Sequence, residues 1–159
     1  MSPSSLWFPA LAMASGMLFA APIWADVIVD DPWVRGTTAS QQATGAFMTI
    51  ISSRDASLVA ASTPAAGIVE IHEMRMDGSS MRMRHVDELA LPAGKRVELN
   101  PGSYHIMLLD LRQQLLAGTK VPLLLKIRNR DGTLSEVAVT AEVTSVAGRK
   151  STPSNHHHH

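Results

Sequence analysis

Methionine and histidine side chains gather in two short stretches of the chain. Residues 72–83 read HEMRMDGSSMRM and residues 104–107 read YHIM, so the two stretches together hold seven side chains with a thioether sulfur or an imidazole, five methionines and two histidines. Thioether sulfur is soft and uncharged and suits Cu(I), whereas it binds zinc, calcium or magnesium poorly. The chain has no cysteine, so blue-copper chemistry is excluded. The donor types therefore predict a site for monovalent copper.

Asp77-Gly78 is a strong signal for a two-residue type I′ hairpin turn. With these two residues as the loop, Met74 pairs with Met81 and His72 pairs with Met83. Strand alternation then places five donors on one face of the hairpin, namely His72, Met74, Met76, Met81 and Met83. We expect a one-residue shift of the loop to break this arrangement. In this register His85 faces Glu70, which indicates an imidazole–carboxylate contact outside the metal site.

His105 and Met107 lie two residues apart in an apolar stretch and therefore share one face of a strand. Two imidazoles and two thioethers converge if this strand lies beside the hairpin, which the sequence does not establish. Methionine on a β-sheet face more often fills a core. However, four of the nine methionines fall within residues 74–83, and core methionines would be spread more evenly. Met74, Met76 and Met81 stay open as accessory ligands, shielding or packing.

Strand signals dominate residues 27–143, because short apolar or alternating runs are separated by Gly, Pro, Asn and Asp. The pattern predicts an all-β sandwich or barrel. The expected strands are Val27–Arg35, Ala43–Ser52, Leu58–Ala61, Ile68–Arg75, Met81–Val86, Arg96–Leu99, Tyr104–Leu111, Val121–Arg128 and Leu134–Val143. Leu108–Gly118 fits a helical stripe and is expected to hold a minor helical turn.

The two ends of the chain differ from this middle part. Residues 1–25 carry no charged side chain and end in Ile-Trp-Ala, which predicts a signal peptide cleaved after Ala25. Residues 26–147 form the expected single domain, and residues 148–159 a flexible tail that ends in His156, His157, His158 and His159, either native or a purification tag. Lys plus Arg and Asp plus Glu are balanced at 14 each, so no basic field argues for nucleic acid.

The spacing from His72 to Met83 to His105 and Met107 resembles the H-x10-M-x21-H-x-M motif of the periplasmic copper chaperones that serve the CuA centre of cytochrome oxidase. The surroundings resemble the family too, including DPWVR at 31–35, TGAFM at 44–48 and PGSYHIMLL at 101–109. The resemblance covers about residues 26–143. It implies a cupredoxin-like Greek-key β-sandwich with a Cu(I) site of these four residues.

The same resemblance implies a monomeric periplasmic carrier, not an enzyme, that gives copper to the oxidase CuA subunit or to a Sco-type thiol protein. Some members bind Cu(II) through a histidine-rich extension, which the four terminal histidines resemble in short form. The mature form is expected not to insert into a membrane. Two other functions remain open, namely copper sequestration or uptake at the envelope, and a metal-free β-sandwich that binds another protein.

Overall fold

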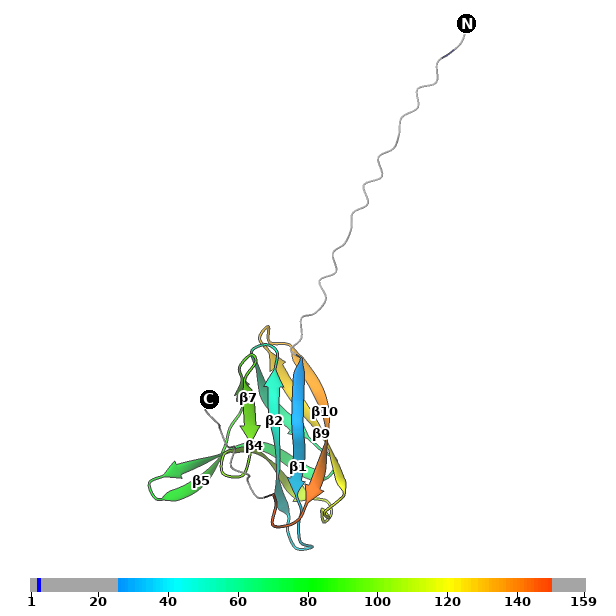
Figure 1. Ribbon diagram of the computed structural model, residues 1–159. Helices are drawn as coiled ribbons and strands as arrows, with labels where there is room; N and C mark the ends of the chain where they lie inside the picture. The colour runs from blue at the N-terminus through cyan, green and yellow to red at the C-terminus, as the bar shows by residue number, and fades with distance from the viewer. Residues whose placement is uncertain (1–2, 4–25, 150–159) are drawn as a thin grey trace, which may run out of the picture.

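The computed structural model describes residue 3 and residues 26–149, and these residues form ten β-strands and no helix (Figure 1). The strands are β1 Val27–Arg35, β2 Ala43–Ser52, β3 Ala56–Ser62, β4 Ala66–Asp77, β5 Ser80–His85, β6 Leu89–Leu91, β7 Arg96–Leu99, β8 Tyr104–Leu111, β9 Lys120–Asn129 and β10 Leu134–Thr144. The expected all-β, cupredoxin-like fold class is confirmed.

All ten strands belong to one hydrogen-bonded sheet. Its path runs β5-β4-β8-β2-β1-β10-β9-β3-β6, and β7 pairs with β2 beside that path. β1 and β10 pair in parallel, whereas the other pairs are antiparallel. The sheet curls on itself, because β3 also contacts β4. β8 therefore lies inside the sheet between β2 and β4, while β5 lies at its end.

The core fills the space that the curled sheet encloses. Alternate residues point inward along β8, β9 and β10, as the alternating burial along these strands shows. Ile50, Ile106, Leu108, Leu125 and Ile127 are fully buried, and each such side chain contributes about 1.5–3 kcal/mol on leaving water. The inward residues of β8 thus anchor the strand whose other face carries His105 and Met107.

The expected strands match the observed ones closely, with two differences. The strand β6 was not predicted, because three residues are too short a run to show a period. The helical turn expected within Leu108–Gly118 is wrong: Tyr104–Leu111 is strand, and the following residues form bends and a turn. Leu111 and Leu115 are nevertheless buried, so their spacing reflects two separate core contacts and not a helix face.

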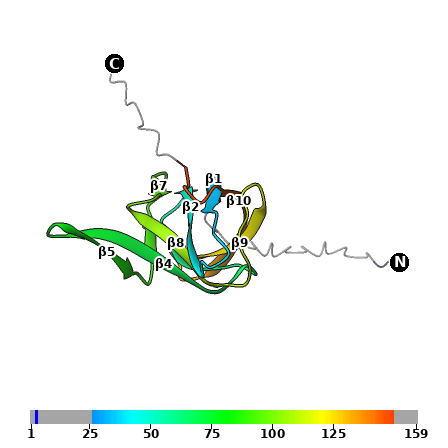
Figure 2. The same cartoon turned by 90° about the horizontal axis from the view of Figure 1, so that it is seen from below.

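The β4–β5 hairpin projects beyond the other strands in both views (Figures 1 and 2). Its loop is Gly78-Ser79, one residue later than predicted, because Asp77 pairs with Ser80. Gly78 has φ of 63° and Ser79 has no positive φ, which fits a type II′ turn with glycine first better than the predicted type I′ turn.

The corrected register changes the partners but keeps the faces. His72 pairs with His85 and Met74 pairs with Met83, where we predicted His72 opposite Met83. Moving a two-residue loop by one position shifts the pairing by two, so every side chain stays on its predicted face. The expectation that such a shift breaks the common face was therefore wrong.

The predicted leader at residues 1–25, apart from residue 3, and the four terminal histidines lie outside the described residues. Within the described part, no helix is long and apolar enough to span a membrane.

Candidate metal site

A row of aromatic rings crosses five strands of the sheet on one face. Strand register sets the row, because His72 on β4 pairs with both His85 on β5 and His105 on β8, and Phe47 on β2 pairs with Trp33 on β1. Neighbouring ring centroids are 6.1 Å apart for His85 and His72, 5.8 Å for His72 and His105, 6.2 Å for His105 and Phe47, and 4.4 Å for Phe47 and Trp33. Three imidazoles thus lie side by side.

A hollow of about 280 Å³ lies beside this row. Met74 and Met83 line it from the hairpin, and His105 and Met107 line it from β8. The remaining wall consists of Arg35, Gln41, Ala43, Thr44, Gly45, Phe47, Pro101 and Gly102. Three thioethers and an imidazole from two structural elements therefore surround one small space.

The two ring nitrogens of His72 have different surroundings. Its Nε2 is 2.7 Å from Oε2 of Glu70, and a carboxylate only accepts hydrogen bonds, so Nε2 carries the proton. Nδ1 is buried and has no hydrogen-bonding partner among the described residues. A carboxylate on the far nitrogen fixes the tautomer and raises the basicity of a metal-binding histidine. His72 thus keeps the lone pair of Nδ1 free for a ligand.

His105 has the opposite arrangement. Its Nδ1 donates to the backbone carbonyl of Ser103 at 3.2 Å, which leaves Nε2 as the unprotonated nitrogen. The side chain is 4% exposed. Burial lowers the pKa of His105, and the neighbouring His72 lowers it further, against the opposing effect of the Ser103 carbonyl. The neutral imidazole that a metal needs is therefore the favoured form.

The structure brings the four predicted site residues to one place, with His105, Met107 and Met83 at the hollow and His72 beside His105. Their role as ligands stays a prediction. Met74, one of the accessory candidates, also lines the hollow. Met76 and Met81 pair with each other nearer the hairpin tip, are 65% and 47% exposed, and do not line it. The terminal histidines lie outside the described residues.

Two features of the site escaped the sequence interpretation. The predicted contact of Glu70 with His85 is present at 3.9 Å, but the closer contact of Glu70 with His72 at 2.7 Å was missed. Glu70 lies two residues before His72 and so shares its face, which is the signal that could have found this contact. Gly45 pairs with Met107 across β2 and β8, and a Cβ atom on it would lie 2.6 Å from the ring of Phe47. A side chain at this position would therefore compete with Phe47 for space next to Met107.

The other face of the hairpin carries charged side chains instead of thioethers and imidazoles. Glu73 lies 3.0 Å from the guanidinium of Arg84, and Arg82 lies 2.9 Å from Asp77. Burial raises the pKa of Glu73, but hydrogen bonds from Arg84 and Tyr104 outweigh it and bring this pKa below its usual value. The hairpin thus separates a thioether face from an ion-paired face.

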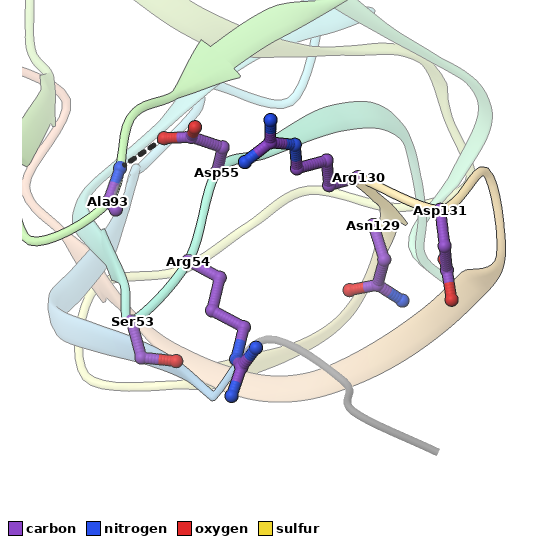
Figure 3. A pocket seen from close by; sticks show the side chains of 7 residues that line it. All are labelled: Ser53, Arg54, Asp55, Ala93, Asn129, Arg130 and Asp131. Carbon is purple, nitrogen blue, oxygen red and sulfur yellow. Dashed lines mark hydrogen bonds between the residues drawn. The ribbon is translucent and has the colours of Figure 1, made fainter.

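A larger hollow, about 560 Å³, lies at the opposite end of the sheet, where β2 and β9 end (Figure 3). Asp55 accepts a hydrogen bond from the backbone of Ala93 at 2.9 Å. Figure 3 shows the side chains of Arg54 and Arg130 ending on different sides of the hollow. Size alone does not make this the functional site, because its mixed charges do not converge on one point.

The fold is that of PCuAC domains. The chain superposes on the copper-bound PCuAC domain from PmoF2 with a TM-score of 0.61 and 19% identity, covering 77% of this chain and 99% of that domain. It is also similar to the solution structure of CuI-DR1885 from Deinococcus radiodurans, with a TM-score of 0.52 and 30% identity over 74% of this chain and 76% of the other.

Residues 27–143 match the family described as putative lipoprotein LpqE-like, and the chain belongs to this family. A putative lipoprotein of Leifsonia xyli, Lxx21020, is 32% identical over 71% of this chain and 68% of its own length. RP573 of Rickettsia prowazekii is 36% identical over 61% of this chain and 57% of its own length.

Proposed function

We propose that this domain carries Cu(I) in the cell envelope and delivers it to a copper-accepting protein, with the CuA centre of cytochrome oxidase as the destination. One observation carries the proposal. The unprotonated nitrogens of two imidazoles, Nδ1 of His72 and Nε2 of His105, lie beside a hollow that Met83 and Met107 line. No other region of the described chain combines soft donors in this way.

The charges around the hollow fit a monovalent ion. Imidazole and thioether donors are neutral, and the hollow is also lined by Arg35, whose guanidinium is always protonated. A divalent ion would meet this fixed positive charge without a carboxylate inside the hollow to compensate it. Cu(I) with neutral soft donors satisfies both the charge and the ligand preference.

The position of the site suits transfer of an ion to a partner protein and not catalysis. Met83 is 49% exposed on the projecting hairpin, so a partner can approach the bound ion from solvent. A partner thiolate is softer than a thioether and charged, and it takes the ion through a complex in which both proteins contribute ligands. The domain therefore acts as a carrier with copper as its cargo, not as an enzyme.

The descriptions of the relatives support an envelope location and copper as the cargo. Two solved structures of similar fold are described as copper-bound PCuAC and CuI-DR1885, and the family is described as lipoprotein-like. Export through the predicted leader would place the domain in the periplasm. A Sco-type thiol protein or the oxidase subunit itself is the partner that this chemistry favours.

Cu(I) titration of the chain against a competing chromophoric chelator tests the cargo. One ion bound more tightly than micromolar is expected, with weaker binding for Met107→Leu and Met83→Leu. Met76→Leu is the matched control, because it removes a thioether from the same hairpin outside the hollow. Binding weaker than micromolar, or equal losses in all three variants, would contradict the proposal.

A deletion strain tests the destination. Loss of the gene should lower cytochrome oxidase activity at limiting copper, and added copper should restore it. Full oxidase activity at low copper, together with altered copper content of the envelope, would replace delivery by sequestration or uptake while leaving the copper site intact.

A further inference from the structure

We propose that Glu70, His72 and His85 form a second metal site, for a divalent cation of borderline hardness such as Zn(II) or Cu(II), which uses Nε2 of His72 and leaves Nδ1 to the Cu(I) site. The inference goes beyond the proposed carrier function, although it shares His72 with it. Each of the three residues offers one ligand atom, and these atoms lie within 4.8 Å of one another.

The distances place the carboxylate at the centre of the group. Oε2 of Glu70 is 2.7 Å from Nε2 of His72 and 3.9 Å from Nδ1 of His85. Donors that share one Zn(II) ion at 2.0–2.2 Å lie at most about 4.4 Å apart. Small side-chain movements therefore bring all three atoms to one ion. Glu70 and His85 can make them, because their side chains are 35% and 54% exposed.

The donor set differs in kind from that of the hollow. It has two imidazole nitrogens and a carboxylate oxygen and contains no sulfur, which is the ligand chemistry of Zn(II) and Cu(II). Glu70 supplies a negative charge next to the ion, and Asp87 lies 3.4 Å from Nε2 of His85. The hollow has Arg35 instead. The two sides of His72 thus favour ions of different charge.

Sharing His72 makes the two sites antagonistic. A neutral imidazole has one proton, and a metal on one nitrogen leaves that proton on the other. Cu(I) at Nδ1 needs the proton on Nε2, where it is donated to Glu70. A divalent ion at Nε2 moves the proton to Nδ1 and removes the lone pair that Cu(I) uses. By linkage, each ion weakens the other by the same factor.

The test uses the chain with His156, His157, His158 and His159 replaced by Ser, so that the tail cannot bind the probe. Zn(II) affinity is measured by competition with a chromophoric chelator, and Cu(I) affinity is measured on the same samples. Glu70→Gln and His85→Ala should each lower Zn(II) affinity at least tenfold. His85→Ala should leave Cu(I) affinity within threefold, whereas Glu70→Gln also removes the carboxylate that orients His72 and should lower Cu(I) affinity as well. Met107→Leu should do the reverse of His85→Ala.

Glu73→Gln is the matched control, because it removes a carboxylate from the other face of the same strand and should leave Zn(II) binding unchanged. Cu(II) should bind more tightly than Zn(II) and give an electron paramagnetic resonance spectrum with two nitrogen couplings that falls to one in His85→Ala. Unchanged Zn(II) affinity in Glu70→Gln and His85→Ala, or equal loss of Cu(I) and Zn(II) affinity in His85→Ala, would overturn the site.

The antagonism is tested by repeating the Zn(II) titration on the Cu(I)-loaded chain. At least tenfold weaker Zn(II) binding is expected, and equal affinity would overturn the sharing of His72. Failure of the carrier proposal is distinguishable, because it removes Cu(I) binding and leaves Zn(II) binding, with its dependence on Glu70 and His85, in place.

Discussion

The β8 side and the hairpin side of the hollow supply similar donors from very different surroundings. His105 and Met107 stand on a strand that is hydrogen-bonded on both edges, to β2 and β4, and whose opposite face is core. Met74 and Met83 stand on a two-stranded extension in which all six residues of β5 are exposed. One half of the site stands on a strand held on both edges, and the other half stands on an exposed hairpin.

This difference suits a protein that must both hold and release an ion. Rigid donors bind without a cost of ordering, because packing has already fixed their rotamers. Donors on an exposed hairpin bind less strongly but can leave one at a time while a partner's ligands enter. Unequal losses on mutating the two halves would support this division, and equal losses would contradict it.

The largest effect is expected at His105. His105→Ala removes a buried donor for which the described site holds no substitute, so Cu(I) affinity should fall more than about 100-fold, or about 2.8 kcal/mol. Chelator competition measures it, with circular dichroism to confirm folding. His85→Ala is the comparison, and it should stay within threefold. A loss below tenfold for His105→Ala would show that the rigid half does not dominate.

Gly45→Ala should destabilise the rigid half without removing a donor. The new Cβ would lie 2.6 Å from the ring of Phe47, which is buried and packed on Trp33. Overpacking of this kind costs about 1–3 kcal/mol. Urea unfolding measures the change in the free energy of unfolding. Gly78→Ala disturbs only the hairpin tip, and a larger loss there would contradict the division.

The loss of Cu(I) affinity on replacing a methionine should depend on whether that methionine stands on β8 or on the hairpin. Met107→Leu should weaken Cu(I) binding about tenfold, or about 1.4 kcal/mol. Met83→Leu should weaken it less, because Met74 pairs with Met83 and lines the same hollow and can replace it. The double variant Met74→Leu/Met83→Leu should equal or exceed Met107→Leu. A single Met83→Leu loss above that of Met107→Leu would reverse the ranking.

The smallest effect is expected from mild acid. Binding needs neutral imidazole, and burial lowers the pKa of His105 below its ordinary value of 6.5, so protons compete at this ligand only below that pH. Cu(I) affinity should therefore change little at His105 between pH 7.5 and 6.5 and fall at lower pH. Proton resonance titration of the metal-free chain gives the pKa directly, and a value for His105 above 6.5 would contradict the prediction.

The sequence was sufficient for most of the fold because most strands are apolar or alternating runs bounded by turn residues. β1, β2, β7 and β8 have their predicted bounds. The missing strand, β6, is held by pairing with β3 and has no pattern of its own. The false helical turn arose because Leu111 contacts the core from the end of β8 and Leu115 contacts it from the following loop, a spacing that a sequence rule cannot distinguish from a helix.

The site was only partly predictable for a similar reason. Strand alternation placed the donors on the correct face, and this placement is the same whichever two neighbouring residues form the hairpin loop. The partner of each donor depends on the turn type, which the Asp77-Gly78-Ser79 sequence leaves ambiguous between two neighbouring loops. The approach of β8 to β4, and with it the contact of His72 with His105, is a long-range pairing that no local pattern encodes.

Exposure of the hairpin thioethers also sets the order in which oxidants damage the molecule. Met76, Met81 and Met83 are 65%, 47% and 49% exposed, whereas Met48 in the core is 3% exposed. Peroxide converts accessible thioethers to sulfoxides, whose oxygen is a hard donor that Cu(I) disfavours. The hairpin methionines are therefore oxidised while the core methionine remains intact. An oxidised molecule stays folded but no longer binds Cu(I).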